Sequence, residues 1–426
     1  MTEIQTAKGT KDIEIGEKIQ INRIVKIITE VFEKYGFNPL QTPILERYET
    51  LAAKYAGGSE IIKETFRLND QGNRDLALRY DLTVPLARYV AMNPNLKMPF
   101  KRYEIGEVFR DGPLKLGRYR EFAQCDCDTI GSPSMLADAE CLAIASEIFS
   151  RLKLKFIIRV NNRKILDAVL EEFNIPKDKR ETAILSIDKL NKIEISGVKK
   201  ELSEKGINNV DRLLNVIFTN DLKDIKKIIK TYEGINELNE VAKYARLLNV
   251  KNLQIDISLA RGLAYYTGTI FEVYLRNSEI KSSVAGGGRY DKMIGNFIGK
   301  DIHSVGISFG INVIKDALKN KMEKNVAQFY LIPINTLEKS LSILTKLRQN
   351  NLKCDIDLNN KGISKNLEYA SRYEIPYVIL IGKDEIKQNK IKLRDMKTGK
   401  EKLLTVNELI LKFKKFLFLK LNNKLS

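Results

Sequence analysis

The chain has 426 residues, and 72 Lys and Arg against 54 Asp and Glu give it a formal net charge of +18. A chain of this length divides into several domains, because single cores stop growing near ~250–300 residues. Its one histidine, His303, excludes any site that needs two, and its four cysteines form no CxxC pair that would indicate a zinc site.

The first 160 residues mix helical and β-like patterns. Apolar residues recur at helical spacing over 15–35, and Gly36 ends that pattern. An extended segment with two prolines follows, which belongs at a sheet edge or an interface. The remaining predicted elements are short β-like runs with turns over 60–130, a helix over 134–152 that begins with Ser132 and Pro133, and a strand over 155–160.

The pattern changes after residue 160. Residues 161–250 are rich in Leu, Ile, Lys and Glu and predict several helices, which we interpret as a helical insertion. The strands predicted after it are Leu253–Ile257, Ile270–Leu275, Ser283–Ala285 and Ser304–Phe309. Further on, strands are predicted at 328–332, 354–358 and 377–381, alternating with helices over 336–350 and 364–373. This βαβα alternation predicts a mostly parallel sheet covered by helices.

We therefore expect a core formed by 1–160 and 251–322, a helical insertion of 161–250, and a C-terminal α/β domain of 326–426. The C-terminal segment carries 20 Lys and Arg against 10 Asp and Glu, a local excess that favours binding of nucleic acid. No apolar stretch approaches the ~20 residues of a membrane-spanning helix. Because Met1–Ile4 also lacks the start of a secretory signal, we expect a cytoplasmic protein with no membrane partner.

Four patches combine arginine, glycine, tyrosine and carboxylates without helical periodicity. They are Leu78–Thr83, Phe109–Phe122 with Gln124, Asp126 and Asp128 just after it, Ala260–Gly268, and Ala285–Asp291. Arginine suits phosphate recognition, because its planar fork donates two parallel hydrogen bonds and keeps its charge. Carboxylates beside tyrosines suit a small cationic or N–H-rich substrate. Two glycine-rich segments, which we interpret as turns, let backbone approach a ligand closely.

No GxxxxGK[ST] phosphate-binding loop is present in the chain. The four patches therefore predict a different kind of site for a nucleotide together with a small molecule. Imidazole can present two N–H donors, so paired acceptors such as Asp128 and a tyrosine oxygen could hold it. A site built to hydrogen-bond its substrate rejects analogues without those groups by roughly 10⁴–10⁵, so no editing domain is expected.

The patches resemble the histidyl-tRNA synthetase family of class II aminoacyl-tRNA synthetases. Phe109–Phe122 is similar to class II motif 2, and RGLAYYTG at Arg261–Gly268 is close to the family's histidine-specific signature, usually RGLDYYTG. The family's AGGRYD element matches Ala285–Asp291 with one extra glycine. Further similar segments are Lys8–Asp12 at the N-terminal segment, Gly36–Pro43 in the motif 1 region, and Ile375–Met396 in the anticodon-binding domain.

The resemblance implies an α+β catalytic core with an antiparallel sheet of the class II synthetase type, a helical insertion and a C-terminal α/β anticodon-binding domain. It also implies that the carboxylate of L-histidine attacks the α-phosphate of ATP, with Mg²⁺ present. The histidyl group would then pass from the adenylate to tRNA(His). The family is dimeric through motif 1, so Phe37–Pro43 is expected at a homodimer interface.

The resemblance assigns roles to single residues. Arg110 and Arg261 would hold the α-phosphate from two sides and are the expected catalytic residues, because preorganised cations stabilise the charge that builds there. Arg118 falls where the family contacts the γ-phosphate end of ATP, and Arg289 is a further expected ATP-binding residue. The expected histidine-binding residues are Asp81, Thr83, Gln124, Asp128, Tyr265, Tyr266 and Tyr290. Of these, Thr83 is expected at the α-amino group, and no metal-binding residue is expected.

Two positions depart from the class II pattern. Val313 stands where motif 3 carries an arginine over the adenine, and Gly112 stands where motif 2 carries a glutamate. Losing that arginine removes a cation–π contact of roughly 0.5–2 kcal/mol. Either ATP binds more weakly or another arginine, such as Arg289, compensates. Asp111 is a candidate to replace the glutamate through a shifted loop.

Two other interpretations stay open. Inactive paralogues that serve as regulatory subunits of histidine biosynthesis resemble the core, but they typically lack the anticodon domain and the phosphate-binding arginines. Here Arg110, Arg118 and Arg261 are all present, and a basic C-terminal segment follows. A generic basic RNA-binding protein would explain the charge but not the Arg261–Gly268 signature. His303 lies outside every matched position, and we expect it to be structural.

Overall fold

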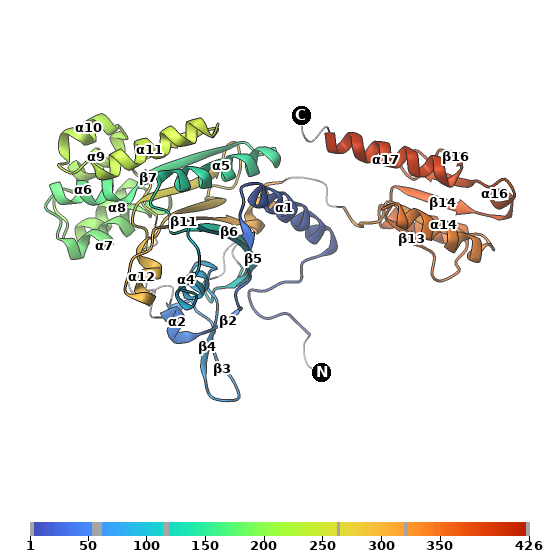
Figure 1. Ribbon diagram of the computed structural model, residues 1–426, viewed down its shortest axis with the longest axis horizontal. Coiled ribbons are helices and arrows are strands. Elements are labelled where there is room, and N and C mark those ends of the chain that lie inside the picture. The colour runs from blue at the N-terminus through green and yellow to red at the C-terminus, as the bar shows by residue number, and fades with distance from the viewer. Residues whose placement is uncertain (1–3, 53–61, 114–118, 262–264, 319–322, 423–426) are drawn as a thin grey trace. The chain divides into compact units, whose positions relative to one another are not determined.

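The structure is a computed structural model that describes residues 4–52, 62–113, 119–261, 265–318 and 323–422 (Figure 1). The chain divides into two compact units. The first comprises residues 1–12 and 21–319, and the second comprises residues 13–20 and 320–426. Each unit has its own sheet and its own core.

The first unit is built on an eight-stranded sheet with the order β1-β5-β6-β11-β10-β9-β7-β8. Its strands are β1 (Asn38–Pro39), β5 (Phe100–Phe109), β6 (Glu121–Ile130), β7 (Phe156–Asn162), β8 (Leu253–Ile255), β9 (Thr269–Leu275), β10 (Ala285–Arg289) and β11 (Ser304–Gly310). The six inner strands pair antiparallel, whereas β1 and β8 at the two edges run parallel to their neighbours. The predicted antiparallel sheet is confirmed, and the segment with two prolines supplies an edge strand as expected.

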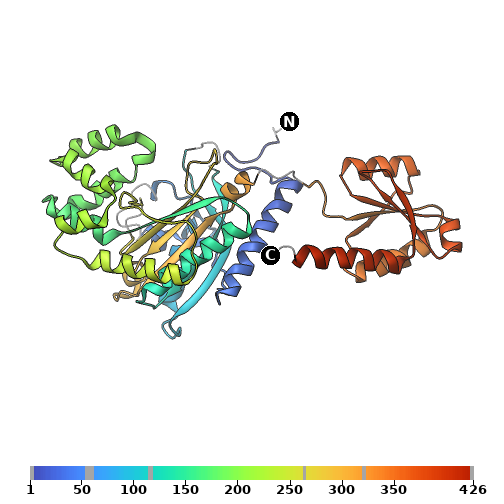
Figure 2. The same cartoon turned by 90° about the horizontal axis from the view of Figure 1, so that it is seen from above.

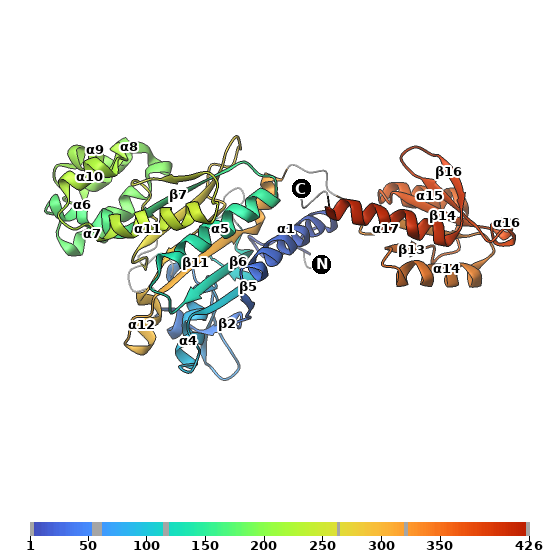
Figure 3. The same ribbon diagram turned by 45° about the horizontal axis from the view of Figure 1, so that its top comes forward.

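Helices cover one face of this sheet. Helix α1 (Ile15–Lys34) buries Ile21, Ile24 and Ile28 along one stripe, as the periodicity predicted. Figure 3 shows α5 (Met135–Arg151) and α11 (Glu233–Leu247) on the same face of the sheet. The Ser134 side chain caps α5 by accepting a hydrogen bond from the Leu136 amide at 3.2 Å. The helix therefore starts at Met135, and the predicted start at Ser132 and Pro133 is wrong by two residues.

The region from 60 to 130 is more regular than the predicted short runs. It holds the two ten-residue strands β5 and β6, and it includes helix α4 (Thr83–Met92), which the sequence analysis missed. A three-stranded sheet lies before α4. Its strands are β2 (Leu45–Arg47), β4 (Asp75–Leu78) and β3 (Arg67–Asn69), with α2 (Tyr48–Ala52) beside them. Helix α12 (Lys292–Ile298) packs against α4.

Residues between β7 and β8 form a succession of helices. They are α6 (Arg163–Glu172), α7 (Lys177–Ile187), α8 (Leu190–Glu204), α9 (Val210–Thr219), α10 (Leu222–Ile228) and α11. Figure 2 shows α6 to α10 gathered beyond one end of the sheet. Their buried apolar side chains, such as Leu166, Leu213 and Ile235, join those of the sheet in one continuous core. The helical character predicted for this segment is confirmed.

The second unit has a five-stranded sheet with the order β13-β12-β14-β15-β16. Its elements are β12 (Phe329–Pro333), α14 (Leu337–Gln349), β13 (Cys354–Ile356), α15 (Ile363–Arg372), β14 (Tyr377–Ile381), α16 (Lys383–Lys387), β15 (Ile391–Asp395), β16 (Glu401–Leu404) and α17 (Val406–Asn422). The first three strands run parallel, as predicted, but β15 and β16 add an antiparallel pair that the sequence analysis missed.

Candidate active site

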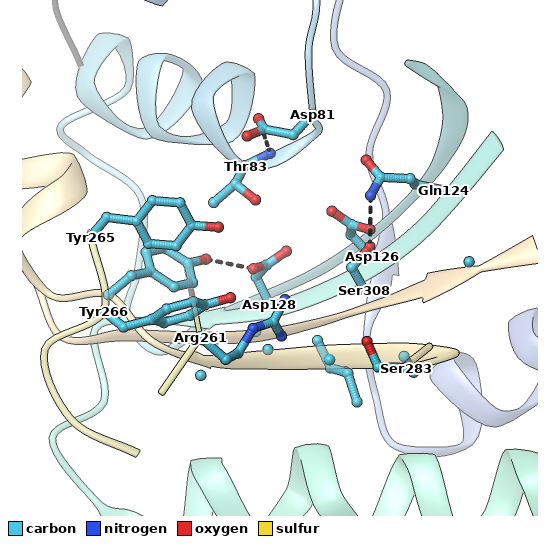
Figure 4. Close-up of a pocket in the computed structure, with 18 of the residues that line it drawn as sticks. Asp81, Thr83, Gln124, Asp126, Asp128, Arg261, Tyr265, Tyr266, Ser283 and Ser308 are labelled. Atoms are coloured by element: carbon cyan, nitrogen blue, oxygen red, sulfur yellow. Dashed lines mark hydrogen bonds between the residues drawn. The ribbon is translucent and has the colours of Figure 1, made fainter. Parts of the chain in front are cut away.

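A cavity of about 390 Å³ lies on the face of the eight-stranded sheet that the helices leave uncovered (Figure 4). Strand β6 explains how its polar floor arises. Successive side chains point to opposite faces of a strand, so Cys125 and Cys127 enter the core beneath α5. Gln124, Asp126 and Asp128 point the other way and line the cavity. The described lining residues are Tyr80, Asp81, Thr83, Arg110, Gln124, Asp126, Asp128, Arg261, Tyr265, Tyr266, Ser283, Val284, Ala285, Gly286, Gly287, Gly288, Tyr290, Gly306, Ile307, Ser308 and Gly310.

The cavity gathers most of the predicted site residues from segments far apart in the chain. All seven predicted histidine-binding residues line it, and so do Arg110 and Arg261. Arg118 and Gly262–Ala264 lie outside the described residues. Arg289 is described but does not line the cavity.

Asp128 is the most strongly held carboxylate of the floor. It is buried, its Oδ2 lies 3.0 Å from Arg102 Nη2, and it accepts a hydrogen bond from the Tyr290 hydroxyl. Burial raises the pKa of Asp128 above its ordinary value, although Arg102 and Tyr290 oppose the rise. Gly306 on the neighbouring strand leaves the space, because a Cβ there would lie 1.9 Å from Asp128 Oδ1. The carboxylate is therefore fixed in place by charge, hydrogen bond and steric fit.

A buried ion network supports this floor from below. Arg102 donates to the Leu82 carbonyl at 3.0 Å and also lies 3.6 Å from Glu104. Glu104 in turn pairs with Arg79 at 2.8 Å. Gly106 provides room, since a Cβ there would lie 2.1 Å from Arg79 Nη2. Buried charges need such partners, so these arginines stabilise the site without reaching a ligand.

The loop before α4 forms another wall of the cavity. Asp81 Oδ1 accepts hydrogen bonds from the backbone amides of Thr83 at 3.1 Å and Val84 at 3.0 Å. These bonds satisfy amide groups at the start of the helix, which have no partner within it. They also fix Asp81 and Thr83 side by side at the cavity (Figure 4).

Three tyrosines make the aromatic end of the cavity. The ring centroids of Tyr265 and Tyr266 are 4.7 Å apart, and Tyr265 meets Tyr290 edge-on at 6.2 Å. Burial raises the pKa of all three phenols, and Asp128 adds to the rise for Tyr290. The hydroxyls therefore stay neutral and can donate or accept hydrogen bonds near neutral pH.

Arg261 lies beside the aromatic cluster. Its guanidinium carbon is 5.3 Å from the centre of the Tyr266 ring. Its Nη1 donates to the Phe271 carbonyl at 3.4 Å, and its Nε is 3.7 Å from Glu272. Gly286 makes room, because a Cβ there would lie 2.2 Å from Arg261 Nη1. The triple glycine is thus not the turn that we predicted. It is the middle of strand β10, where small residues let a guanidinium and strand β11 approach.

Arg110, a further residue that lines the cavity, stacks between aromatic rings. Its guanidinium carbon lies 4.3 Å from the Tyr80 ring and 5.0 Å from the Phe122 ring, and its Nε donates to the Tyr80 carbonyl at 3.3 Å. Stacking of this kind orients the planar fork while leaving edge N–H groups for a ligand. Arg110 and Arg261 thus line the same cavity from different elements.

The Glu64 carboxylate lies beside Gly112, where the class II pattern has a glutamate. A Cβ at Gly112 would lie 2.7 Å from Glu64 Oε1, and the Tyr80 hydroxyl donates to Glu64 at 3.1 Å. Asp111, the predicted substitute, instead pairs with Arg120 at 2.9 Å. A carboxylate from another segment therefore occupies the space next to Gly112, and the glycine keeps that space open.

Arg289 has a different environment from the cavity arginines. Its Nε and Nη2 donate to the buried Asp138, and its other donors reach the carbonyls of Ser132 at 3.0 Å and Ser134 at 3.1 Å. These contacts bind β10 to the start of α5. They give no support to the prediction that Arg289 binds ATP or compensates for Val313, which is half-buried against the core.

Asp126, Ser283 and Ser308 line the cavity but were not predicted as site residues. The signal for Asp126 was present in the sequence, because it lies midway between two predicted residues at alternate positions of one strand. Ser308 was also detectable, since it is paired with Asp126 across β6 and β11, but only once that pairing is known. His303 lies outside the cavity, where its Nδ1 is 3.0 Å from Asp291.

Comparison with known proteins bears on the open interpretations. Residues 9–314 match the family model described as histidyl-tRNA synthetase. The chain belongs to the histidyl-tRNA synthetase family. Residues 328–416 match the model of an anticodon binding domain. The predicted family, enzyme class and class II fold are therefore confirmed.

Individual members of the family agree with this placement. Histidine–tRNA ligase 1 of Bacillus cereus is 44% identical over 422 residues, covering 96% of this chain and 99% of the relative. The crystal structure of histidyl-tRNA synthetase from Nostoc sp. PCC 7120 has a TM-score of 0.87 at 32% identity, covering 97% of this chain and all of that one.

A fold neighbour also bears on the regulatory alternative. The Bacillus halodurans structure described as an ATP phosphoribosyltransferase regulatory subunit/histidyl-tRNA synthetase has a TM-score of 0.76 at 21% identity, covering 89% of this chain and 98% of that one. This likeness shows the shared fold alone, so the regulatory interpretation has less support than the ligase. Among the described residues, no helix is long and apolar enough to cross a membrane.

Proposed function

We propose that the chain joins L-histidine to tRNA(His) through a histidyl-adenylate, at the cavity on the eight-stranded sheet. The observation that carries this proposal is the meeting of two kinds of groups in one cavity. Fixed acceptors suited to histidine lie there together with Arg110 and Arg261, which are suited to phosphate.

The amino-acid end of the cavity suits an imidazole. Asp128 is held by Arg102 and Tyr290, and Tyr265 packs against Tyr290. A ring N–H can donate to Asp128, and a tyrosine hydroxyl can bond the other nitrogen. In this proposal Asp81, Thr83 and Gln124 hold the backbone end of histidine, with Thr83 at the α-amino group. A substrate without these donors and acceptors would leave buried groups unpaired.

Arg110 and Arg261 are the proposed catalytic residues. When the histidine carboxylate attacks the α-phosphate of ATP, negative charge grows on the phosphate oxygens. Two guanidiniums already oriented by stacking and by Glu272 can stabilise that charge without rearranging. Arg118 is proposed at the γ-phosphate end on the resemblance alone, since it lies outside the described residues.

ATP and Mg²⁺ are the proposed co-reactants. Among the described residues, no group of three or more Asp, Glu, His or Cys side chains gathers in a way that could cage a metal ion. Mg²⁺ commonly binds through one or two carboxylates and the phosphates of a nucleotide, so we propose that it enters with ATP. Its charge, when bound there, would help to neutralise the phosphates.

The basic C-terminal segment is the proposed tRNA-binding module. Residues 326–426 carry a net charge of +10, from 20 basic and 10 acidic residues. Phosphate contacts made by Lys and Arg release counterions, so tRNA affinity should fall as salt rises. The domain limits 1–160 with 251–322, 161–250 and 326–426 are kept as a proposal, and so are a homodimer through the motif 1 segment and a cytoplasmic location.

Histidine-dependent exchange of pyrophosphate into ATP tests the proposed activation step. We expect the purified chain to exchange pyrophosphate with L-histidine and not with the other amino acids, and to charge tRNA(His) when tRNA is added. A protein without exchange would contradict the adenylate step and favour the regulatory-subunit alternative. Exchange without charging would leave activation intact and contradict the tRNA step.

A further inference from the structure

Asp126 is the one of the three β6 side chains lining the cavity, Gln124, Asp126 and Asp128, to which the proposed reaction gives no role. It lies between Gln124 and Asp128, lines the cavity and is only 4% exposed. Ser308, its cross-strand partner on β11, hydrogen-bonds to its carboxylate. Among the described residues, Asp126 Oδ1 has no hydrogen-bond partner. A buried carboxylate oxygen without a donor is costly, so this position lacks a donor that a ligand could supply.

The charges around Asp126 are predominantly negative. Asp128 faces it from the same strand, Asp81 from the loop before α4, and Glu104 is its cross-strand partner on β5. Arg102 is the cation that acts on Asp126 from β5, and it is already shared between Asp128 at 3.0 Å and Glu104 at 3.6 Å. Tyr266 faces the group as a neutral phenol. Among the described residues, the Asp126 carboxyl therefore has no cation of its own to stabilise its ionised form.

The chemistry of the proposed substrate indicates which group could fill this place. Near neutral pH the imidazole ring of histidine is mostly uncharged, because its pKa is about 6.5. The α-ammonium is then the main cation of the amino acid and offers three N–H donors. An ammonium would form a charge-assisted hydrogen bond with the ionised carboxylate of Asp126, whereas a neutral ring would leave that ionised form without a compensating charge.

Resting on the proposed activation of histidine, we propose that Asp126 is a specificity-determining residue that binds the α-ammonium of the substrate. Asp81 and Thr83 line the same cavity and complete the ammonium site in this proposal. Asp128 and Tyr290 serve the imidazole ring. Two aspartates that are two residues apart on one strand thus recognise opposite ends of one small molecule.

The electrostatic environment of Asp126 agrees with this assignment. Burial, followed by the charge of Asp128, raises the pKa of Asp126 to about 8. The carboxyl is therefore mostly protonated in the free protein at pH 7, and an ammonium beside it favours the ionised form. Binding of histidine should release a proton near pH 7, and histidine affinity should rise with pH up to about 8.

A calorimetric binding experiment with three ligands distinguishes recognition of the ammonium end from recognition of the imidazole end. Histidine carries ring, ammonium and carboxylate; histamine lacks the carboxylate; and 3-(imidazol-4-yl)propionate lacks the ammonium. We expect Asp126→Asn to weaken histidine and histamine by about tenfold or more, the scale of one charge-assisted hydrogen bond. It should change the binding of imidazolylpropionate by less than about twofold. The matched variant Asp128→Asn should weaken all three ligands.

Proton release provides a test in the unmodified protein. Titrating histidine at pH 7 in two buffers of different ionisation enthalpy counts the protons released on binding. We expect a release close to one proton in the wild type and its loss in Asp126→Asn.

Folding of the Asp126→Asn variant can be checked by its thermal transition. The raised pKa means that Asp126 favours the folded state fully below its unfolded pKa and loses that contribution as pH rises through about 8. Asn cannot ionise, so the variant should fold at pH 8.

The binding and exchange experiments distinguish failure of the ammonium site from failure of the proposed reaction. Equal weakening of histidine and imidazolylpropionate by Asp126→Asn would overturn the assignment, because the residue would then act on the ring or on the fold. Wild-type binding without proton release would overturn it as well. If binding depends on Asp126 as expected but pyrophosphate exchange is absent, the ammonium site stands and the proposed reaction fails.

Discussion

Two sets of arginines in the first unit differ in what their guanidiniums touch. Arg79, Arg102 and Arg289 are buried, and each pairs with a buried carboxylate of the protein. Arg110 and Arg261 line the cavity, where aromatic rings orient them and few donors are used by the protein. The protein supplies a carboxylate partner to each arginine of the first set, whereas Arg110 and Arg261 keep donors available for phosphate. The environment, and not the residue type, separates structural from ligand-binding arginines.

Replacing a buried arginine should have the largest effect, and that effect should be on folding. In Arg289→Ala the fully buried Asp138 loses its cation, so we expect the free energy of unfolding to fall by about 3–5 kcal/mol. Denaturant unfolding measures this loss. Replacing both partners together, as Arg289→Met with Asp138→Leu, should recover part of it. An Arg289→Ala protein of normal stability with a raised ATP KM would return Arg289 to the nucleotide site.

Replacing a cavity arginine should have nearly as large an effect, but on activity. Arg261→Ala removes a preorganised cation from the proposed phosphate site, so we expect pyrophosphate exchange to fall by about 10²–10³. The unfolding transition should change little, because the ion pair of Arg261 with Glu272 is long, at 3.7 Å. Arg261→Lys keeps the positive charge but lacks the planar guanidinium. Its rate of pyrophosphate exchange should lie between those of the wild type and Arg261→Ala. A loss below tenfold would remove Arg261 from the catalytic role.

A smaller effect should follow from placing a side chain against Asp128, the carboxylate that pairs with Arg102. In Gly306→Ala the new Cβ would lie 1.9 Å from Asp128 Oδ1, so either Asp128 or the strand must shift. We expect a loss of about 1–3 kcal/mol in stability and a weaker affinity for histidine, read by calorimetry. Gly362→Ala is the control, because nothing lies within 4 Å of a Cβ there. Unchanged histidine affinity would mean that Asp128 does not bind the substrate.

The sequence predicted the residues that line the cavity better than the buried arginines that pair with carboxylates of the protein. The RGLAYYTG signature and the motif 2 pattern contain Arg110, Arg261, Tyr265 and Tyr266 within short segments, so local matching was enough. Arg289 was expected at ATP as an arginine that could compensate for Val313. Its pairing with Asp138, 151 positions away in the chain, has no local signal in the sequence. Asp126 was named beside Gln124 and Asp128 in the sequence but was given no role. It has no counterpart among the matched positions, and only the alternation of a strand places it in the cavity.

The fold shows the same limit. Helical periodicity predicted α1 and the helical segment, because their helices bury an apolar face. The alternation of short apolar runs with helical segments predicted the three parallel strands of the second unit, of which β12 and β14 are buried along most of their length. Helix α4 was missed because residues 60–130 were interpreted as short β-like runs with turns. Its Pro85 lies in the first turn, where proline is tolerated because the amides have no helical partner. The triple glycine was read as a turn, since nothing in the segment itself shows that Arg261 needs the space at Gly286.

The smallest effect is expected at Val313, where the family pattern has an arginine. Val313 lies on α13 (Ile311–Ala317), which begins directly after the cavity residue Gly310, and it is half-buried against the core. An arginine there could reach adenine and restore a cation–π contact, so Val313→Arg should lower the ATP KM by about two- to fivefold. Val313→Met adds length without charge and should leave KM unchanged. If the arginine variant shows no gain, position 313 does not face the nucleotide in this protein, and Arg110 and Arg261 hold ATP without a third cation from α13.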